Sequence, residues 1–353
     1  MDPCAPPVNL SSTPKILISV GILAILSGCY YVQATRGQME VLSKREPIDE
    51  ILQSPDTPEE LSRRLKLVQE ARQFSVDELA LPDNKSYRTY SDLERDYVVW
   101  NVFAAPEFSL DARNWCYPVV GCVSYRGYFS EQAARKEAGK LKGKGFDVAV
   151  GGVPAYSTLG NFNDPILNTM MHWDDTHLVS TLFHELAHQV LYIKDDTGFN
   201  ESFATAVEEI GIERWLDANS KQGDMSRYRA RKEQHRQLVE LVGAAREDLG
   251  DYYSRDIDAE TMRRLKVLRL AQLSADVRAA LEAAARSNNH WLSGELNNAR
   301  LLPMTIYDGR VPAFRALFAD CDFDLACFYA EAKKISRLKK PQRDARLDAL
   351  EIA

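Results

Sequence analysis

The chain has 353 residues, of which 45% are hydrophobic and 27% charged, and its formal net charge is −7 at pH 7. This composition is typical of an ordinary globular protein and argues against a disordered chain. The negative charge excludes the basic footprint of a nucleic-acid-binding protein, so no nucleic-acid partner is predicted. The length allows one large domain or two small ones.

The N-terminus carries an apolar run, residues 16–26, which is preceded by Lys15. The run has signal-peptide length and is too short to span a bilayer, although an uncleaved anchor helix is the alternative. It ends in Leu-Ser-Gly-Cys at Cys29, which resembles the lipobox of bacterial lipoproteins. The resemblance implies that a signal peptide, residues 1–28, is removed and that acylated Cys29 anchors the chain to a lipid bilayer. Tyr30 rather than Asp follows, so we expect an outer-membrane lipoprotein of the bacterial envelope that faces the periplasm.

Residues 29–85 are predicted to form an N-terminal helical region. Thr57 and Pro58 mark a helix start with proline at the first position. Leu61 and Leu65 then repeat at helical spacing and indicate a buried face.

Residues 86–219 are predicted to be the α/β core, because β-rich segments precede helical ones. A short strand before the next helix is followed by glycines. An exposed strand edge there would bind a peptide substrate through main-chain hydrogen bonds. Gly152, Ala155 and Tyr156 are therefore the predicted substrate-binding residues, unless the glycines only make turns.

Residues 184–188 read His-Glu-Leu-Ala-His within an apolar run of helical period. Residues four apart lie on one face of a helix, so His184 and His188 can bind one metal ion, predicted to be Zn²⁺. Glu185 can reach a zinc-bound water and is the predicted catalytic base for attack on a peptide carbonyl. Asp174 and its neighbours supply the start of this helix.

The third metal ligand follows the motif. Glu201 is the candidate because it opens a second predicted helix, residues 199–216. The first helix is expected to run about 6 residues beyond His188, from where the loop can return. Asp195 or Asp196 is the alternative ligand.

The C-terminal part is predicted to contain a helical insertion or hairpin (220–290), a return to the core (291–340) and a polar tail (341–353). No strict heptad run predicts a dimer, and the sequence leaves the oligomeric state open. Tyr307 is a candidate for stabilising the transition state, unless it is one of fifteen tyrosines packed in a core. Glu208 could support a metal ligand, bind a substrate amine, or be a solvated carboxylate.

Four cysteines remain besides Cys29 after removal of the signal: Cys116, Cys122, Cys321 and Cys327. An oxidising periplasm permits disulfides, and three pairings are possible. Among these pairings the local one, Cys116–Cys122 with Cys321–Cys327, is favoured. A set of free buried thiols is the alternative to any disulfide.

The chain resembles a family of bacterial lipoproteins described as predicted aminopeptidases, of the gluzincin type. The resemblance covers most of the mature chain and rests on five segments: residues 115–122, 155–160, 184–188, 200–204 (Asn-Glu-Ser-Phe-Ala) and 296–301. It implies a mostly helical α+β fold, like that of a gluzincin metallopeptidase, with a small mixed β-sheet next to the HExxH helix. It also implies that Glu201 binds zinc and that Glu185 is the base. The aminopeptidase expectation comes from this resemblance alone, since the Gly-x-Met-x-Asn segment of larger aminopeptidases is absent.

Together these patterns predict a lipid-anchored zinc peptidase, expected to be an aminopeptidase that acts on a peptide substrate. An envelope metallo-endopeptidase is one alternative, and a non-catalytic zinc-binding lipoprotein scaffold is another. The intact Glu185 argues against the scaffold, because a structural zinc site has no use for a base.

Overall fold

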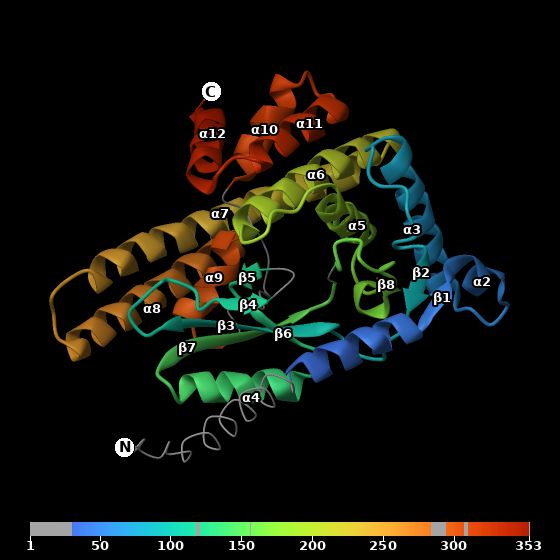
Figure 1. The fold of residues 1–353 in the computed structure, drawn as a ribbon. Helices are drawn as coiled ribbons and strands as arrows, with labels where there is room; N and C mark the ends of the chain where they lie inside the picture. The colour runs from blue at the N-terminus through green and yellow to red at the C-terminus, as the bar shows by residue number, and fades with distance from the viewer. Residues whose placement is uncertain (1–29, 118–120, 156, 284–293, 307–309, 353) are drawn as a thin grey trace, which may run out of the picture.

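The computed structural model describes residues 30–117, 121–155, 157–283, 294–306 and 310–352 (Figure 1). Residues 1–28 and Cys29 therefore lie outside the described residues. Residues 30–43 are helical. After them come, in chain order, β1 (Arg45–Pro47), α2 (Ile48–Gln53), α3 (Glu59–Asp77), β2 (Thr89–Ser91), β3 (Val99–Pro106), β4 (Trp115–Tyr117), β5 (Gly121–Val123), β6 (Arg126–Tyr128), α4 (Glu131–Lys142), β7 (Phe146–Val153), β8 (Ile166–Leu167), the 3₁₀ turn η1 (Asn168–Met170), α5 (Asp175–Val190), α6 (Thr197–Ala218), α7 (Gln222–Tyr253), α8 (Ala259–Ala283), α9 (Asn298–Ile306), α10 (Val311–Asp320), α11 (Leu325–Ser336) and α12 (Lys340–Ile352). Among the described residues, no helix is both long and apolar enough to cross a membrane.

The larger sheet is antiparallel, with the strand order β6-β3-β7. Successive residues of a strand point to opposite faces. Val102 and Ala104 of β3 therefore pack with α4, whereas Phe103 and Ala105 pack with α9. Because both faces of this sheet are covered by helices, β3 is buried almost throughout its length.

Two smaller sheets complete the β-structure. In the first, β2 pairs antiparallel with β1 and parallel with β8. The second is the β4–β5 hairpin, in which Cys116 lies opposite Cys122 and forms a disulfide with it. The described residues thus hold three small sheets, of which β1-β2-β8 is mixed, as the expected small sheet was. The class is α+β and mostly helical, as predicted.

The main hydrophobic core joins the middle of the chain to its C-terminal helices. Phe203 of α6 lies 5.6 Å (ring centroids) from Phe314 of α10 and 5.8 Å from Phe328 of α11. The same core contains Phe183 and Leu186 of α5. In Figure 1, α10 to α12 lie beside α6, on the side away from the larger sheet. The C-terminal helices therefore support the two helices that carry the predicted metal ligands.

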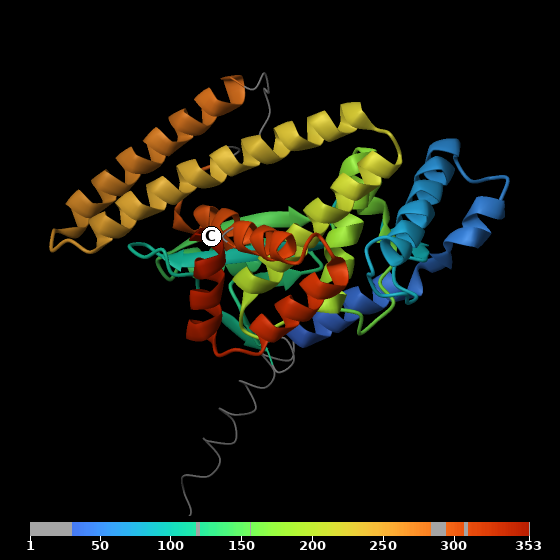
Figure 2. The same ribbon diagram turned by 90° about the horizontal axis from the view of Figure 1, so that it is seen from above.

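Helices α7 and α8 form a long hairpin that extends from the body of the molecule (Figure 2). The two helices pack against each other through their own apolar cluster, which includes Leu238, Val242, Leu273 and Val277. Leu301 of α9 belongs to the same cluster and connects the base of the hairpin to the larger sheet.

The expected polar tail is instead the helix α12, and this prediction was wrong. Leu347 and Leu350 are buried at helical spacing. Arg343 is also buried and donates from Nη2 to Oδ2 of Asp196 at 2.5 Å. From the sequence alone, Arg343 cannot be distinguished from a solvated arginine. The buried face of α12 was therefore not recognised.

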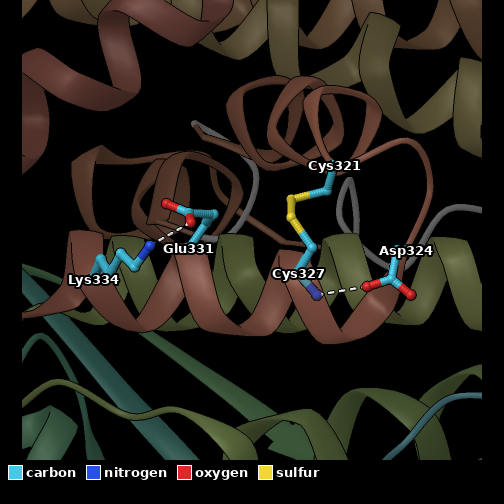
Figure 3. Close-up of a disulfide and its surroundings, with 5 residues drawn as sticks. All are labelled: Cys321, Asp324, Cys327, Glu331 and Lys334. Carbon is cyan, nitrogen blue, oxygen red and sulfur yellow. Dashed lines mark hydrogen bonds and ion pairs between the residues drawn. A yellow bond between two sulfur atoms is a disulfide. The ribbon is translucent and has the colours of Figure 1, made fainter.

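A second disulfide joins Cys321, directly after α10, to Cys327 in the first turn of α11 (Figure 3). The side chain of Asp324 caps this helix by accepting a hydrogen bond from the backbone N–H of Cys327 at 2.7 Å. Both disulfides have the local pairing favoured from the sequence, and each closes a short loop.

Candidate metal centre

Helix α5 carries the HExxH motif, and local sequence explains its N-terminus. Asp174 is the N-cap, and its carboxylate accepts from the backbone N–H of His177 at 3.0 Å. Leu178, Leu182 and Phe183 are fully buried, so this face of the helix packs into the main core. The side chains of His184 and His188 lie on another face of the helix, which is turned toward α6.

Helix α5 ends sooner after His188 than the sequence predicted, so more of the connection to α6 is non-helical. Helix α5 ends at Val190, only two residues after His188. The side-chain amide of Asn200 donates to the carbonyl oxygen of Ile193 and accepts from its N–H, both at 2.7 Å. These two hydrogen bonds satisfy the backbone N–H and carbonyl of Ile193, which lies outside both helices. They thereby fix the conformation of the link between α5 and α6.

The structure brings His184, His188 and Glu201 together. Among the described residues they form a cluster whose ligand atoms all lie within 4.8 Å of one another. The two Nε2 atoms are 3.2 Å apart, and Oε2 of Glu201 lies 3.3 Å from Nε2 of His184 and 3.6 Å from Nε2 of His188. Ligands placed tetrahedrally at zinc distances of 2.0–2.1 Å are about 3.3 Å apart. Donor types and separations therefore fit a zinc ion.

The electrostatics of the cluster favour a cation. Burial opposes the charged form of His184, but hydrogen bonds with Glu201 and Glu208 outweigh it and raise its pKa to about 10. Burial acts to raise the pKa of Glu201, but the charges and hydrogen bonds of His188 and His184 lower it strongly. The three side chains thus stabilise one positive charge among them, which a divalent ion can supply in place of a proton.

Glu208 lies behind the cluster, two turns after Glu201 on α6. Its Oε2 is 3.2 Å from Nδ1 of His184, and its Oε1 is 3.6 Å from Nζ of Lys232. An acceptor at Nδ1 leaves the Nε2 lone pair of His184 directed at the cluster. Of the three interpretations left open by the sequence, the contact with His184 favours support of a metal ligand.

Glu185 lies on α5 next to the cluster and is partly buried. Burial raises its pKa above the usual carboxyl value, while His184 and His188 act in the opposite direction. A carboxylate with a raised pKa beside a cation-binding cluster is suited to accept a proton from water.

The two alternative ligands have other partners. Oδ1 of Asp195 accepts from the backbone N–H of Cys122 at 2.5 Å and thereby joins the β4–β5 hairpin to the α5–α6 link. Asp196 caps α6 through the N–H of Phe199 and pairs with Arg343. Neither belongs to the cluster, so Glu201 is the third member.

Of the three predicted substrate-binding residues, the structure describes Gly152 and Ala155. Gly152 is exposed on β7, and a Cβ there would lie 2.4 Å from the ring of Tyr97, so packing alone explains this glycine. Ala155 packs against the main core. Tyr156 and the transition-state candidate Tyr307 lie outside the described residues.

Sequence reasoning missed two tyrosines near the cluster. Burial is the main cause that raises the pKa of Tyr125, and the charges of Glu201 and Glu185 add to it. The pKa of Tyr192 is raised by burial and then by Glu201. Tyr192 is four residues after His188, a spacing that could have drawn attention to it. Tyr125 lies between β5 and β6, and only the fold brings it here.

This fold and cluster define an α+β protein with an HExxH helix and a cluster of three residues that could hold a metal ion. Residues 29–347 match the model of a protein family whose description is "putative aminopeptidase". The chain therefore belongs to this family, and the membership supports a peptidase. No curated protein and no solved structure matches the chain.

Proposed function

We propose that the protein is a zinc-dependent aminopeptidase. The observation that carries the proposal is the convergence of His184, His188 and Glu201, with Glu185 on the same helix as both histidines. Two imidazoles and a carboxylate are a donor set that zinc uses in catalytic sites, where a fourth position stays open. Family membership independently supports a peptidase.

Bound at this cluster, zinc supplies Lewis-acid activation of a water molecule and of the substrate carbonyl. Glu185 accepts the proton of the attacking water and then delivers a proton to the leaving amine. Glu208 accepts a hydrogen bond from Nδ1 of His184 and so keeps that imidazole in the tautomer that can bind metal.

A phenol is the proposed donor to the developing oxyanion. Tyr307 is one candidate, and Tyr125 is a second because the charges of Glu201 and Glu185 both act on it. The two can be separated by Tyr125→Phe and Tyr307→Phe variants. Loss of the catalytic donor should lower kcat by about 10²-fold or more, with little change in bound zinc.

The substrate is a peptide, which we propose binds along residues 151–156 in extended form. Among the described strands β7 pairs only with β3, and its C-terminal residues Gly151 and Gly152 are exposed. Ala155 continues this segment toward the core that contains α5. In this proposal Gly152, Ala155 and Tyr156 contact the substrate main chain.

We further propose that acylated Cys29 anchors the protein to the envelope, on the periplasmic side of the outer membrane. The support is the sequence Leu-Ser-Gly-Cys after an apolar run. A Cys29→Ser variant should move from the membrane fraction to the soluble fraction and should no longer incorporate labelled fatty acid. Retention in the membrane fraction by this variant would favour an uncleaved apolar anchor.

The decisive test is Glu185→Gln, with Glu247→Gln on the exposed face of α7 as the matched carboxylate-to-amide control. The Glu185 variant should bind zinc in a one-to-one ratio and lose peptide hydrolysis by several orders of magnitude. The control should retain both properties. Hydrolysis that persists in the Glu185 variant would favour an activity from another site. Unchanged biological activity in a variant that hydrolyses nothing would favour the non-catalytic zinc scaffold.

Exopeptidase and endopeptidase action are distinguished with pairs of peptides that differ only in N-terminal acetylation. An aminopeptidase should cleave the free peptides and leave the acetylated ones intact. Equal cleavage of both would support the alternative, a metallo-endopeptidase of the envelope.

A further inference from the structure

The N-terminal helix, residues 30–43, is packed onto the body of the molecule from its first residue. The ring of Tyr30 stacks on that of Tyr117, with the centroids 5.7 Å apart. One turn further on, Gly37 lies so close to Phe129 that a Cβ would be 2.0 Å from the ring. Residue 30 is therefore already part of the folded protein.

This packing brings the proposed membrane anchor close to the folded protein. Consecutive Cα atoms are about 3.8 Å apart, so an acyl anchor on Cys29 would lie directly beside Tyr30. The alternative anchor, the uncleaved apolar run of residues 16–26, ends four residues before Tyr30. With either anchor, the surface at the start of the N-terminal helix would face the lipid. This step rests on the proposed anchor and not on the proposed peptidase activity.

One face of the N-terminal helix is exposed and carries large apolar side chains. Tyr31, Val32 and Met39 are 47%, 67% and 57% exposed. Together with the exposed Arg36, they fall within an arc of about 140° around the helix axis. Exposed hydrophobic residues that are scattered singly are common, but three on one arc form a patch of the kind that binds a partner or a membrane.

Helix α4 extends this surface with basic residues. It packs against the same apolar cluster as Tyr30, and both helices run along the lower side of the molecule in Figure 1. Ala134 and Ala138 of α4 are buried against the larger sheet. By helical spacing, the exposed Lys136 and Lys140 lie on the opposite, outward side.

The acidic residues of these two helices all have basic partners. Glu40 is the only acid between residues 30 and 43, and it pairs with Arg95 at 3.0 Å. In α4, Glu131 pairs with Arg135 at 2.6 Å, and Glu137 lies 3.7 Å from Lys140. Although the whole chain has a net charge of −7, the charges of these helices therefore suit an anionic lipid surface.

We propose that the exposed face of the N-terminal helix (Tyr31, Val32, Arg36 and Met39) and the outward lysines of α4 lie on the lipid bilayer. The apolar side chains enter the boundary between headgroups and acyl chains, and the basic side chains contact phospholipid headgroups. The anchored protein thus has one fixed orientation. Helices α10 to α12, on the other side of the larger sheet in Figure 1, are held away from the lipid.

The test is photo-crosslinking of the full-length protein in bacteria, with p-benzoyl-L-phenylalanine in place of either Val32 or Met39. Phe323, between α10 and α11, is the matched control position, because it is apolar, 63% exposed and on the far side of the sheet. Phospholipid adducts are measured by mass spectrometry after irradiation of intact cells. The adduct yield at Val32 and Met39 should exceed that at Phe323 by about tenfold or more, because only the first two positions reach the acyl chains.

The basic residues are tested with the purified, acylated protein in vesicles of phosphatidylethanolamine and phosphatidylglycerol. Lys136→Gln combined with Lys140→Gln should lower the adduct yield at Met39 by about twofold or more. Lys333→Gln combined with Lys339→Gln, two exposed lysines on the side of α11 and α12, is the control and should have no effect. Equal yields from the two lysine pairs would remove α4 from the proposed surface.

Equal adduct yields at all three positions, or none at Val32 and Met39, in a protein that stays in the membrane fraction would overturn the inference and leave the anchor intact. Crosslinks to a protein in place of lipid would overturn it as well. A protein that is soluble and incorporates no labelled fatty acid would refute the anchor and this inference together. None of these results affects the test of the peptidase with Glu185→Gln.

Discussion

Arg343 and Asp196 are 147 residues apart in the chain and form a buried ion pair, with 5% and 7% of each residue exposed. Both Nε and Nη2 of Arg343 donate to Oδ2 of Asp196, at 3.0 and 2.5 Å. Asp196 is also the N-cap of α6, the helix that carries Glu201. The pair therefore connects α12 to the start of α6, the helix that carries Glu201 of the candidate metal cluster.

Replacing Arg343 with Met should destabilise the protein by about 3 kcal/mol, because the buried carboxylate of Asp196 would lose both hydrogen bonds from Arg343 and keep the weaker ion pair with Lys340, at 3.6 Å. Chemical denaturation measures this change. Arg346→Met, on the exposed face of the same helix, should change stability by less than about 0.5 kcal/mol. Adding Asp196→Asn to the Arg343 variant should recover part of the loss. Equal effects of the two arginine replacements would show that the ion pair is not the cause.

Zinc binding by variants tests whether Glu201 or Asp195 is the third ligand. Glu201→Gln should reduce the zinc content of the purified protein strongly, because one of three protein ligands is lost. Asp195→Asn should retain zinc, since an amide oxygen can still accept the hydrogen bond from Cys122. Metal analysis after dialysis measures both. Loss of zinc only in the Asp195 variant would contradict the assignment of Glu201.

If His184 binds zinc as proposed, removing its partner Glu208 should weaken metal binding without abolishing it. Glu208→Gln is expected to lower zinc affinity by about 10- to 100-fold. A competition titration with a chromogenic chelator gives the affinity. The control is Asp217→Asn, an exposed carboxylate near the end of the same helix. If the Glu208 variant binds zinc as tightly as the control, its contact with His184 has no positioning role.

Two buried tyrosines provide a matched pair for stability. The hydroxyl of Tyr329 donates to the carbonyl oxygen of Leu79 at 2.9 Å, whereas that of Tyr228 makes no hydrogen bond among the described residues. Tyr329→Phe should therefore cost about 1 kcal/mol, and Tyr228→Phe should be neutral or stabilising. Thermal denaturation compares the two. A loss of stability in Tyr228→Phe as large as in Tyr329→Phe would mean that the Tyr228 hydroxyl already has a partner.

Local patterns in the sequence predicted the helix that carries the motif, since its N-cap and its apolar period are both local features. Asp174 caps α5, and Leu178 and Leu182 face the core, as the spacing indicated. The sequence also predicted that Glu201 joins the two histidines of the HExxH helix, because Glu201 begins a second apolar run shortly after the motif. The function of Asn200 was not, although the residue belongs to the same motif, because its hydrogen bonds to Ile193 depend on the conformation of the link.

Contacts between distant segments could not be read from the sequence. Tyr125 comes from the link between β5 and β6, and only the fold brings it near enough for the charges of Glu201 and Glu185 to add to the rise of its pKa that burial causes. The buried face of α12 was hidden because Arg343 looks like a surface residue until Asp196 is placed beside it. The division of the strands into three sheets was hidden for a similar reason, since strand partners such as β2 and β8 are far apart in the chain.

The double hydrogen bond between Asn200 and Ile193 fixes how many residues can separate the two helices of the metal centre. Each residue added to or removed from the start of α6 would rotate Glu201 by about 100° around the helix axis. A single-residue insertion after Thr197 should therefore turn the carboxylate away from both imidazoles, even if every other contact formed. The interval from the second histidine to the glutamate thus sets the direction of the third ligand, and in this chain its length cannot change without separating the glutamate from the two histidines.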